Sequence, residues 1–403
     1  MGEARRMPVT PMLGASMFFT GIIFASTAPY AAIVGIETLG LSSTHYAALT
    51  SFGAVFGAVM AMLVGYISDR LPDRRALVLM CATAGLVGFG LIYLVRAPWA
   101  FILSTAIIMP FGLGIFSQTF AYVRVYYNDR APERSQFMVS AMRTVFTLAW
   151  VVVPPIAGYV AASYSVFDVY LVAALAYAAC GIVFAAMMAD KSTRIAAAPI
   201  ARKAAGEKRF DLPGTVAIGL AGIFIVNIAM RLFGLAMPLT IITRLGGTLA
   251  DVGIFAGIGA ALEIPFMLMW GYLLRYVSRE AIIAGNAVLY AIFIALVVNA
   301  GSVVEVLWLQ AINGVATAAL MSIPISYMQD AIKGRVGLST SIMDVTAIGS
   351  TLIGAAIFGA LTLGGSYQPV LVAASVIALL GGTTMLAGNL ARIRRMDAAR
   401  SRA

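Results

Sequence analysis

The sequence has little charge, one histidine and only two cysteines. Of its 403 residues, 11% are charged, whereas a soluble domain carries about a quarter. The cysteines, Cys81 and Cys180, both fall inside apolar runs. This shortage argues against a soluble protein, and neither a disulfide framework nor a metal cluster can be built from two such cysteines.

Motifs for nucleotide binding and for catalysis are also missing. No glycine-rich phosphate loop ending in Gly-Lys occurs, which argues against an ATP-driven pump. His45 is expected at the outer start of a helix, where it is interpreted as an interfacial residue or, alternatively, a pH sensor. With one peripheral histidine, no enzymatic activity and no cofactor are expected, apart from a proton gradient as the source of a coupling ion.

Long apolar segments dominate what is present. The chain is 61% hydrophobic, and runs of about 20 residues, each able to span a hydrocarbon core roughly 30 Å thick as a helix, recur along it. An all-α polytopic membrane protein is therefore predicted. The twelve predicted spans are 11–35, 45–67, 76–95, 98–122, 136–162, 165–188, 214–242, 249–272, 281–300, 303–328, 336–363 and 366–390.

The basic residues are distributed asymmetrically between the two sides. Most Lys and Arg residues fall in the loops on the side of the termini, and only Arg96 and Arg244 fall in loops on the other side. This positive-inside pattern predicts that both termini are cytoplasmic. The net charge of +10 therefore indicates lipid headgroups rather than nucleic acid as the partner.

An internal repeat divides the chain into two halves. Its residues 201 positions apart match in six pairs: Tyr126 and Tyr327, Asp129 and Asp330, Arg134 and Arg335, Ser140 and Ser341, Met142 and Met343, Gly158 and Gly359. At the same offset Arg143 corresponds to Asp344. Parallel repeats of this kind predict two pseudo-symmetric six-helix bundles, 1–189 and 214–403, joined by a basic cytoplasmic linker at 190–213.

The loop after the second span carries a recognisable motif. It resembles the signature of the major facilitator superfamily, which runs Gly, a spaced Asp-Arg, a Gly and a basic pair. The matching residues are Gly65, Asp69, Arg70, Arg74 and Arg75, with Pro72-Asp73 in place of the second glycine. The resemblance covers essentially the whole chain and implies two bundles around a central cavity.

A narrower resemblance is to the bacterial sugar efflux transporters. It is carried by "YNDRAPERSQFMVSAMRTVFTLAWVVVPPIAG" (127–158), "AALEIPFMLMWGY" (260–272) and "MQDAIKGRVG" (328–337). The resemblance implies export of sugars or glycosides in exchange for protons, across a bacterial cytoplasmic membrane, and a monomer is expected. A proton-coupled exporter of drugs and a transporter of organic or sugar acids are the alternatives, whereas the duplication disfavours a channel.

Four ionisable residues lie within predicted spans. They are Arg143, Arg231, Glu263 and Asp344. Such residues are costly in a bilayer and usually face the bundle interior. We hypothesise that Arg143 and Glu263 pair, either as a fixed interhelical salt bridge or as a bridge that opens on binding of substrate or proton.

Glu263 and Asp344 are the candidate proton carriers, although Asp344 could instead be a solvated residue at a helix start. Arg231 shares a helix face with Asn227. Three roles stay open for Arg231: binding a carboxylated or phosphorylated substrate, pairing with an acid, or extending to the membrane surface.

Sugar recognition also requires neutral hydrogen-bonding groups and an aromatic face. Gln118 with Tyr122, and Gln310 with Asn313, lie one helical turn apart, and Trp150 offers a stacking surface. Hydrogen bonding between helices explains the amides equally well. The predicted substrate site comprises Arg143, Trp150, Gln118, Tyr122, Asn227, Arg231, Glu263, Gln310 and Asn313.

Three further residues are assigned to gating. Asp69 and Arg70 lie at the inner end of the second span, where a carboxylate can face a helix N-terminus and hold the cytoplasmic side closed. Asp330 lies at the corresponding end of the tenth span.

Overall fold

The computed structural model describes residues 8–68, 71, 73–195, 214–331 and 336–400. These residues form helices and connections, with no strand among them, and twelve of the helical segments are long and apolar enough to cross a membrane. Each of the twelve overlaps one predicted span. The predicted all-α polytopic class is therefore confirmed.

Contacts group the chain into two compact units. Unit 1 comprises Met1–Leu41, Phe52–Lys203 and Leu249–Gly257, and unit 2 comprises Ser42–Ser51, Ala204–Thr248 and Ile258–Ala403. The predicted division into 1–189, 190–213 and 214–403 stays a prediction, because most of the linker, 196–213, lies outside the described residues.

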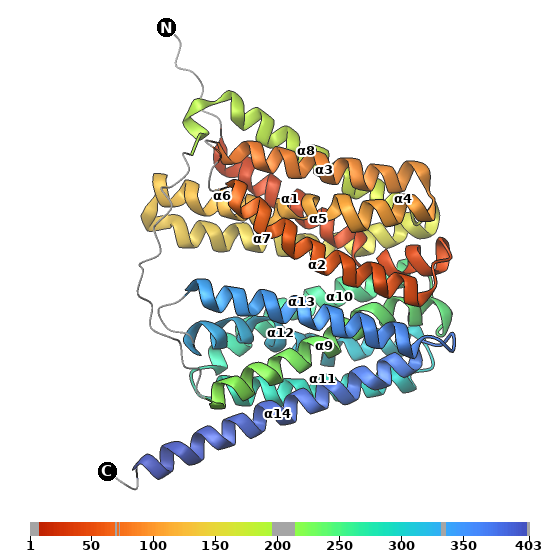
Figure 1. Ribbon diagram of the computed structural model, residues 1–403, viewed down its shortest axis with the longest axis vertical. Coiled ribbons are helices and arrows are strands. Elements are labelled where there is room, and N and C mark those ends of the chain that lie inside the picture. Colours follow the sequence, from red (N-terminus) through yellow and green to blue (C-terminus); the bar gives the residue numbers. More distant parts are fainter. Residues whose placement is uncertain (1–7, 69–70, 72, 196–213, 332–335, 401–403) are drawn as a thin grey trace. The chain divides into compact units, whose positions relative to one another are not determined.

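In unit 1, α1 packs against α7 and α8, and α3 packs against α8 (Figure 1). Apart from the first turns of α10, the helices that contribute to this unit are α1 (Val9–Thr27), η1 (Ile33–Thr38), α2 (Ser43–Ser68) from Phe52 onward, α3 (Arg74–Val95), α4 (Pro98–Leu103), η2 (Ser104–Ile108), α5 (Met109–Gly112), α6 (Gly114–Arg130), α7 (Pro132–Ser163), α8 (Asp168–Ala189) and η3 (Lys191–Thr193).

The predicted span 98–122 is interrupted within the bilayer region. It consists of α4, the π-helical segment η2, α5 and the start of α6. Pro110 lies in this stretch and cannot donate a backbone hydrogen bond. A Cβ on Gly112 would lie 2.9 Å from the Cα of Gly85, so the two glycines allow α5 to approach α3 closely.

In unit 2, α14 packs against both α9 and α11, and α11 packs against α12 (Figure 1). The helices that contribute to this unit are α9 (Gly214–Thr243), α10 (Leu249–Leu273), α11 (Arg279–Asn299), α12 (Val303–Ala331), α13 (Val336–Leu361) and α14 (Gln368–Arg400).

The first turns of α10 belong to unit 1, where they pack directly on the paired prolines of α7. A Cβ on Gly257 would lie 2.5 Å from the Cγ of Pro155, and one on Gly253 would lie 2.6 Å from the hydroxyl oxygen of Tyr30. The Tyr30 hydroxyl donates to the carbonyl oxygen of Pro154 at 3.2 Å. Because the helices touch through backbone atoms, no side chain fits at the two glycines.

Candidate substrate and coupling site

Three polar residues form one face of α12 in unit 2. Gln310, Asn313 and Thr317 follow one another at the spacing of successive helical turns. The Asn313 Nδ2 donates to Gln310 Oε1 at 2.6 Å, and the Thr317 hydroxyl donates to the Asn313 carbonyl oxygen at 2.8 Å. The structure therefore brings the predicted amides together on one face of α12.

α10 faces this row of polar groups. A Cβ on Gly259 would lie 3.3 Å from Gln310 Oε1, so the missing side chain lets α10 approach the amides. One turn later, Glu263 of α10 lies near the Thr317 hydroxyl of α12. The indole Nε1 of Trp270 donates to the Val315 carbonyl oxygen at 2.9 Å and fixes α10 against α12.

One acceptor in this cluster is unfilled. Gln310 and Asn313 expose only 1% and 7% of their surface, and the Asn313 Oδ1 has no hydrogen-bond partner among the described residues. Most buried polar side-chain atoms in proteins are hydrogen-bonded. An orphaned carbonyl oxygen next to a second amide suits a ligand rich in hydroxyl donors.

The predicted residues of α7 lie in unit 1. Arg143 is exposed, and its backbone carbonyl oxygen accepts the Thr147 hydroxyl at 3.0 Å. Trp150 is half-buried and packs against Ala25 and Val153. Because Arg143 and Glu263 belong to different units, their pairing stays a prediction, and so does sugar stacking on Trp150.

Gln118 and Tyr122 are both buried within unit 1. The Tyr122 hydroxyl donates to the Thr193 carbonyl oxygen at 2.5 Å, and its ring packs edge-on against Phe184. These contacts give Tyr122 a structural role at the end of α8. Substrate binding by Gln118 and Tyr122 stays a prediction to which this geometry adds no support.

Arg75 is the most highly connected cation in the described part of the chain. Arg75 is 3% exposed. Its guanidinium donates to both carboxylate oxygens of Asp73, and its Nη1 donates to the carbonyl oxygens of Met187 at 2.7 Å and Asp190 at 3.0 Å. The same Nη1 donates to the Thr193 hydroxyl at 2.5 Å. Arg75 thus joins the start of α3 to the end of α8.

Asp73 is the N-cap of α3, where its carboxylate accepts the backbone N–H of Arg75. Burial alone would raise the pKa of Asp73, but the hydrogen bonds and charge of Arg75 hold that pKa below its ordinary value. Asp73 and Arg75, at the end of the motif after the second span, therefore build a structural junction in unit 1.

Within the described part of the chain, the remaining predicted site residues of unit 2 make no hydrogen bond or ion pair with the α10–α12 cluster. The Asn227 amide donates to the Ile223 carbonyl oxygen of its own helix at 2.9 Å. Arg231 is exposed on α9 beside Gly354 of α13, and Asp344 is exposed on α13. Their roles in binding and proton coupling stay predictions.

Two of the three gating residues, Asp69 and Arg70, lie outside the described residues. The third, Asp330, has its carboxylate 2.7 Å from the Arg279 guanidinium, which joins the end of α12 to the start of α11 within unit 2. Both side chains are exposed, and such pairs contribute about 0–1 kcal/mol, so the gating role of Asp330 stays a prediction.

Two contact residues were not predicted. Thr317 lies one turn beyond Asn313, and the spacing of residues 310, 313 and 317 was a signal that could have found it. Tyr30 bridges the carbonyl oxygens of Pro154 and Leu249, at 3.2 and 3.4 Å. No local pattern marks this tyrosine, because both partners are backbone atoms far away in the sequence.

Comparison with known proteins identifies relatives that match most of the chain. Sugar efflux transporter A of Dickeya chrysanthemi is 27% identical over 95% of this chain and 96% of its own length. Sugar efflux transporter C of Escherichia coli K12 is 26% identical over 81% of this chain and 82% of its own length. The crystal structure of the nucleoside transporter NupG shares the fold, with a TM-score of 0.71, 15% identity, and coverage of 95% and 99% of the two chains.

The family assignment covers both halves. A model described as the Major Facilitator Superfamily matches residues 1–152 and 219–400. Together with the transporter relatives and the twelve apolar helices, this match identifies a multi-pass membrane transporter of small molecules rather than an enzyme. The chain belongs to the Major Facilitator Superfamily.

Proposed function

We propose that this transporter exports sugars or glycosides by alternating access. The observation that carries the proposal is the buried α10–α12 cluster, in which Asn313 Oδ1 lacks a hydrogen-bond donor among the described residues and Glu263 lies beside Thr317. Sugar hydroxyls both donate and accept hydrogen bonds and so match this set of amides, hydroxyl and carboxyl. The names of the relatives from Dickeya chrysanthemi and Escherichia coli support the same substrate class.

Proton exchange is the coupling reaction that we propose. Glu263 is the carboxyl group of the α10–α12 cluster, and its neighbour Thr317 can donate or accept a hydrogen bond as the carboxyl group changes protonation. Protonated and ionised forms of Glu263 would differ in how strongly they hold a sugar hydroxyl. The chain would act as a monomer in a bacterial cytoplasmic membrane, surrounded by lipid, with both termini in the cytoplasm.

Counterflow in proteoliposomes tests the substrate class. The panel contains labelled sugars, glycosides, sugar acids and cationic dyes, each measured with and without a pH gradient. Exchange restricted to sugars or glycosides and accelerated by the gradient is expected. Transport of dyes alone would replace the proposal with drug export, and absence of counterflow would indicate a channel.

Arg231 favours a second candidate, transport of a sugar acid or another organic acid. Arg231 lies on α9 and has no hydrogen bond or ion pair within the described part of the chain. A carboxylate is the natural partner of such a group. Exchange of gluconate or galacturonate at rates above those of neutral sugars, lost in Arg231→Gln, would favour this candidate.

A further inference from the structure

One buried tyrosine bridges α7 and the first turns of α10. Tyr30 lies between α1 and η1, is fully buried, and donates its hydroxyl to the Pro154 carbonyl oxygen of α7 at 3.2 Å and to the Leu249 carbonyl oxygen of α10 at 3.4 Å. A Cβ on Gly158 would lie 2.8 Å from both the Tyr30 hydroxyl oxygen and the Leu249 carbonyl oxygen. All four residues belong to unit 1. The tyrosine hydroxyl therefore sits inside a crossing that is otherwise made by backbone atoms.

α10 continues past this crossing into unit 2. Its residues Leu249–Gly257 group with unit 1 and those from Ile258 onward group with unit 2, although α10 is one helix over Leu249–Leu273. Displacements of packed helices move whole turns together, so a shift of the first turns away from α7 reaches the turn that carries Glu263. The contact made by Tyr30 therefore bears on the helix that supplies the carboxyl group of the α10–α12 cluster.

The internal repeat has a second crossing of the same kind in unit 2. Gly359 of α13 is the repeat equivalent of Gly158, and a Cβ on Gly359 would lie 3.1 Å from the Cβ of Ala47 and 3.6 Å from the Cα of Thr44 in the first turns of α2. α2 also changes units, because Ser42–Ser51 group with unit 2. A cavity of about 370 Å³ adjoins this crossing and the approach is longer, so the Tyr30 crossing is the tighter of the two.

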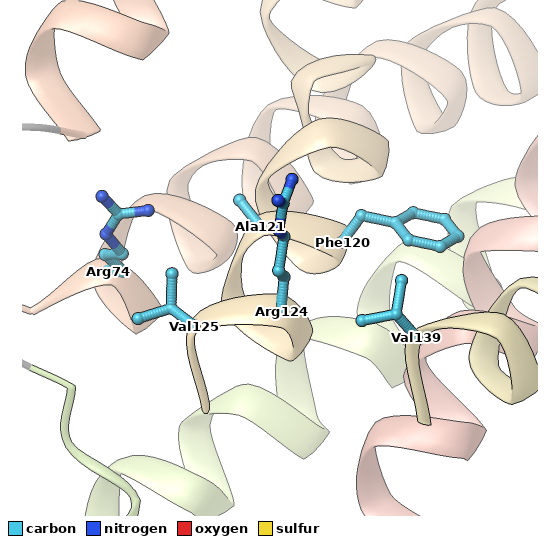
Figure 2. A pocket seen from close by; sticks show the side chains of 6 residues that line it. All are labelled: Arg74, Phe120, Ala121, Arg124, Val125 and Val139. Carbon is cyan, nitrogen blue, oxygen red and sulfur yellow. The ribbon is translucent and has the colours of Figure 1, made fainter. Parts of the chain in front are cut away.

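The other end of α7 borders a cavity. A pocket of about 440 Å³ lies between the first residue of α3, α6 and the first turns of α7, all in unit 1, and is lined by Arg74, Phe120, Ala121, Arg124, Val125 and Val139 (Figure 2). Pro154 and Gly158 lie in the last turns of the same helix α7. Unit 1 is therefore hollow at the predicted cytoplasmic end of α7 and closed by backbone contacts at the predicted outer end.

We propose that Tyr30 is a gating residue, whose hydroxyl holds the predicted outer end of unit 1 closed and must release α10 for that end to open. The inference rests on the alternating access proposed above and adds to the gating residues predicted from the sequence. Glycines at the crossing let α7 and α10 meet and part without interlocking side chains. One neutral hydrogen bond shifts a two-state equilibrium by roughly two- to tenfold, which a transport cycle can reverse.

A distance measurement across the crossing tests the proposal. Spin labels are attached to the full-length transporter in nanodiscs at Tyr159→Cys on α7 and Ile254→Cys on α10, which are exposed positions next to the crossing, whereas both native cysteines are buried. Pulsed electron paramagnetic resonance then gives the populations with short and long distances. Tyr30→Phe keeps the ring but removes the hydroxyl, so the ratio of long to short distances is expected to rise by about two- to tenfold.

Tyr164→Phe is the matched control, because Tyr164 is 80% exposed after the end of α7 and its hydroxyl lies outside the crossing. It is expected to leave the distance distribution unchanged. Gel filtration and the melting temperature show whether each variant is folded. If Tyr30→Phe does not fold, Gly158→Ala replaces it, since the added Cβ would displace the Tyr30 hydroxyl.

Two results would overturn the proposal. One is the wild-type distance distribution in Tyr30→Phe, including a distribution that stays entirely at the short distance or a melting temperature that falls alone, as a purely structural role predicts. The other is an equal shift in Tyr164→Phe. The measurement needs no cargo, so a shift in a protein that exchanges no sugar would retain Tyr30 as a gating residue and refute the proposed substrate class instead.

Discussion

At the scale of single residues, Arg75 shows how a buried charge is satisfied without a binding role. Its donors are divided between the Asp73 carboxylate and the last acceptors of α8. Carbonyl groups at a helix C-terminus have no partner within the helix, so a guanidinium is well suited to them. Tyr122 reaches the same segment through Thr193, which makes this junction a network of side chains and backbone.

Arg75→Gln is expected to lower the free energy of unfolding by about 3 kcal/mol, because it leaves Asp73 and the carbonyl groups without a cation. Tyr122→Phe removes one hydrogen bond and is expected to cost about 1 kcal/mol. Unfolding in mixed micelles, followed by circular dichroism, measures both. If Tyr122→Phe instead abolishes sugar exchange while stability is unchanged, the predicted substrate role of Tyr122 regains support.

The Asp73–Arg75 contact also predicts a dependence on pH. Because Arg75 lowers the pKa of Asp73 in the folded protein, the carboxylate stabilises the fold above its unfolded pKa, about 3.9. This contribution is lost as the pH falls through the lower folded pKa. Asp73→Asn should therefore reduce the melting temperature at pH 7, and the difference from the wild type should disappear at strongly acidic pH. A constant difference across the titration would contradict this assignment.

Glu263 is the residue at which the proposed coupling can be isolated. Glu263→Gln keeps the size and hydrogen-bonding capacity of the side chain but removes its ability to exchange a proton. We expect acceleration by a pH gradient to be lost while sugar counterflow persists. The matched control is Glu133→Gln, because Glu133 is exposed in the first turn of α7. Acceleration by the gradient at the wild-type level in Glu263→Gln would exclude Glu263 as the proton carrier.

At the scale of helices, the sequence predicted that each membrane helix is present better than it predicted whether the helix is continuous. Length and hydropathy located the span that begins at Pro98, but not its π-helical interruption at η2. In the same span α5 packs against Gly85 of α3, a contact between residues distant in the chain that hydropathy does not report. Likewise, the paired prolines 154–155 were visible in the sequence, whereas their contact with Gly253 and Gly257 depends on tertiary packing.

Gly253→Ala tests the crossing of α7 and α10. Its Cβ would collide with the Pro154 carbonyl oxygen, so the helices must separate, at a cost of about 1–3 kcal/mol. Gly271→Ala on the same helix is the control, because nothing lies within 4 Å of its added Cβ. Unfolding of both variants is compared with their rates of counterflow. Wild-type behaviour of Gly253→Ala would show that this crossing is looser than the structure indicates.

At the scale of the whole molecule, the fold class, family and helix count could be predicted because they depend on length, hydropathy and repetition. Gln310 and Asn313 share one helix face and are joined by a hydrogen bond, whereas their role in substrate binding stays a prediction. The Arg143–Glu263 pair stays a prediction because it joins separate units, and the buried position of Tyr122 could not be inferred from its spacing to Gln118.

The membrane orientation can be tested with thiol chemistry. Cys81 and Cys180 are fully buried, so the wild type should not react with a membrane-impermeant maleimide added to intact cells. Ser366→Cys, in the connection between α13 and α14, is expected to react from outside, whereas Ser192→Cys is expected to react only after the membrane is permeabilised. The reverse pattern would place both termini outside.

The unfilled Asn313 acceptor has a consequence for how cargo is discriminated. A hydrophobic pocket distinguishes ligands by one methylene only weakly, whereas a buried acceptor strongly rejects an analogue that lacks the donor it needs. For a polyhydroxylated cargo, selection at Asn313 would therefore follow the pattern of hydroxyl groups more than ring size or bulk. A deoxygenated analogue would then be a poorer cargo than a larger glycoside that keeps the contacted hydroxyl.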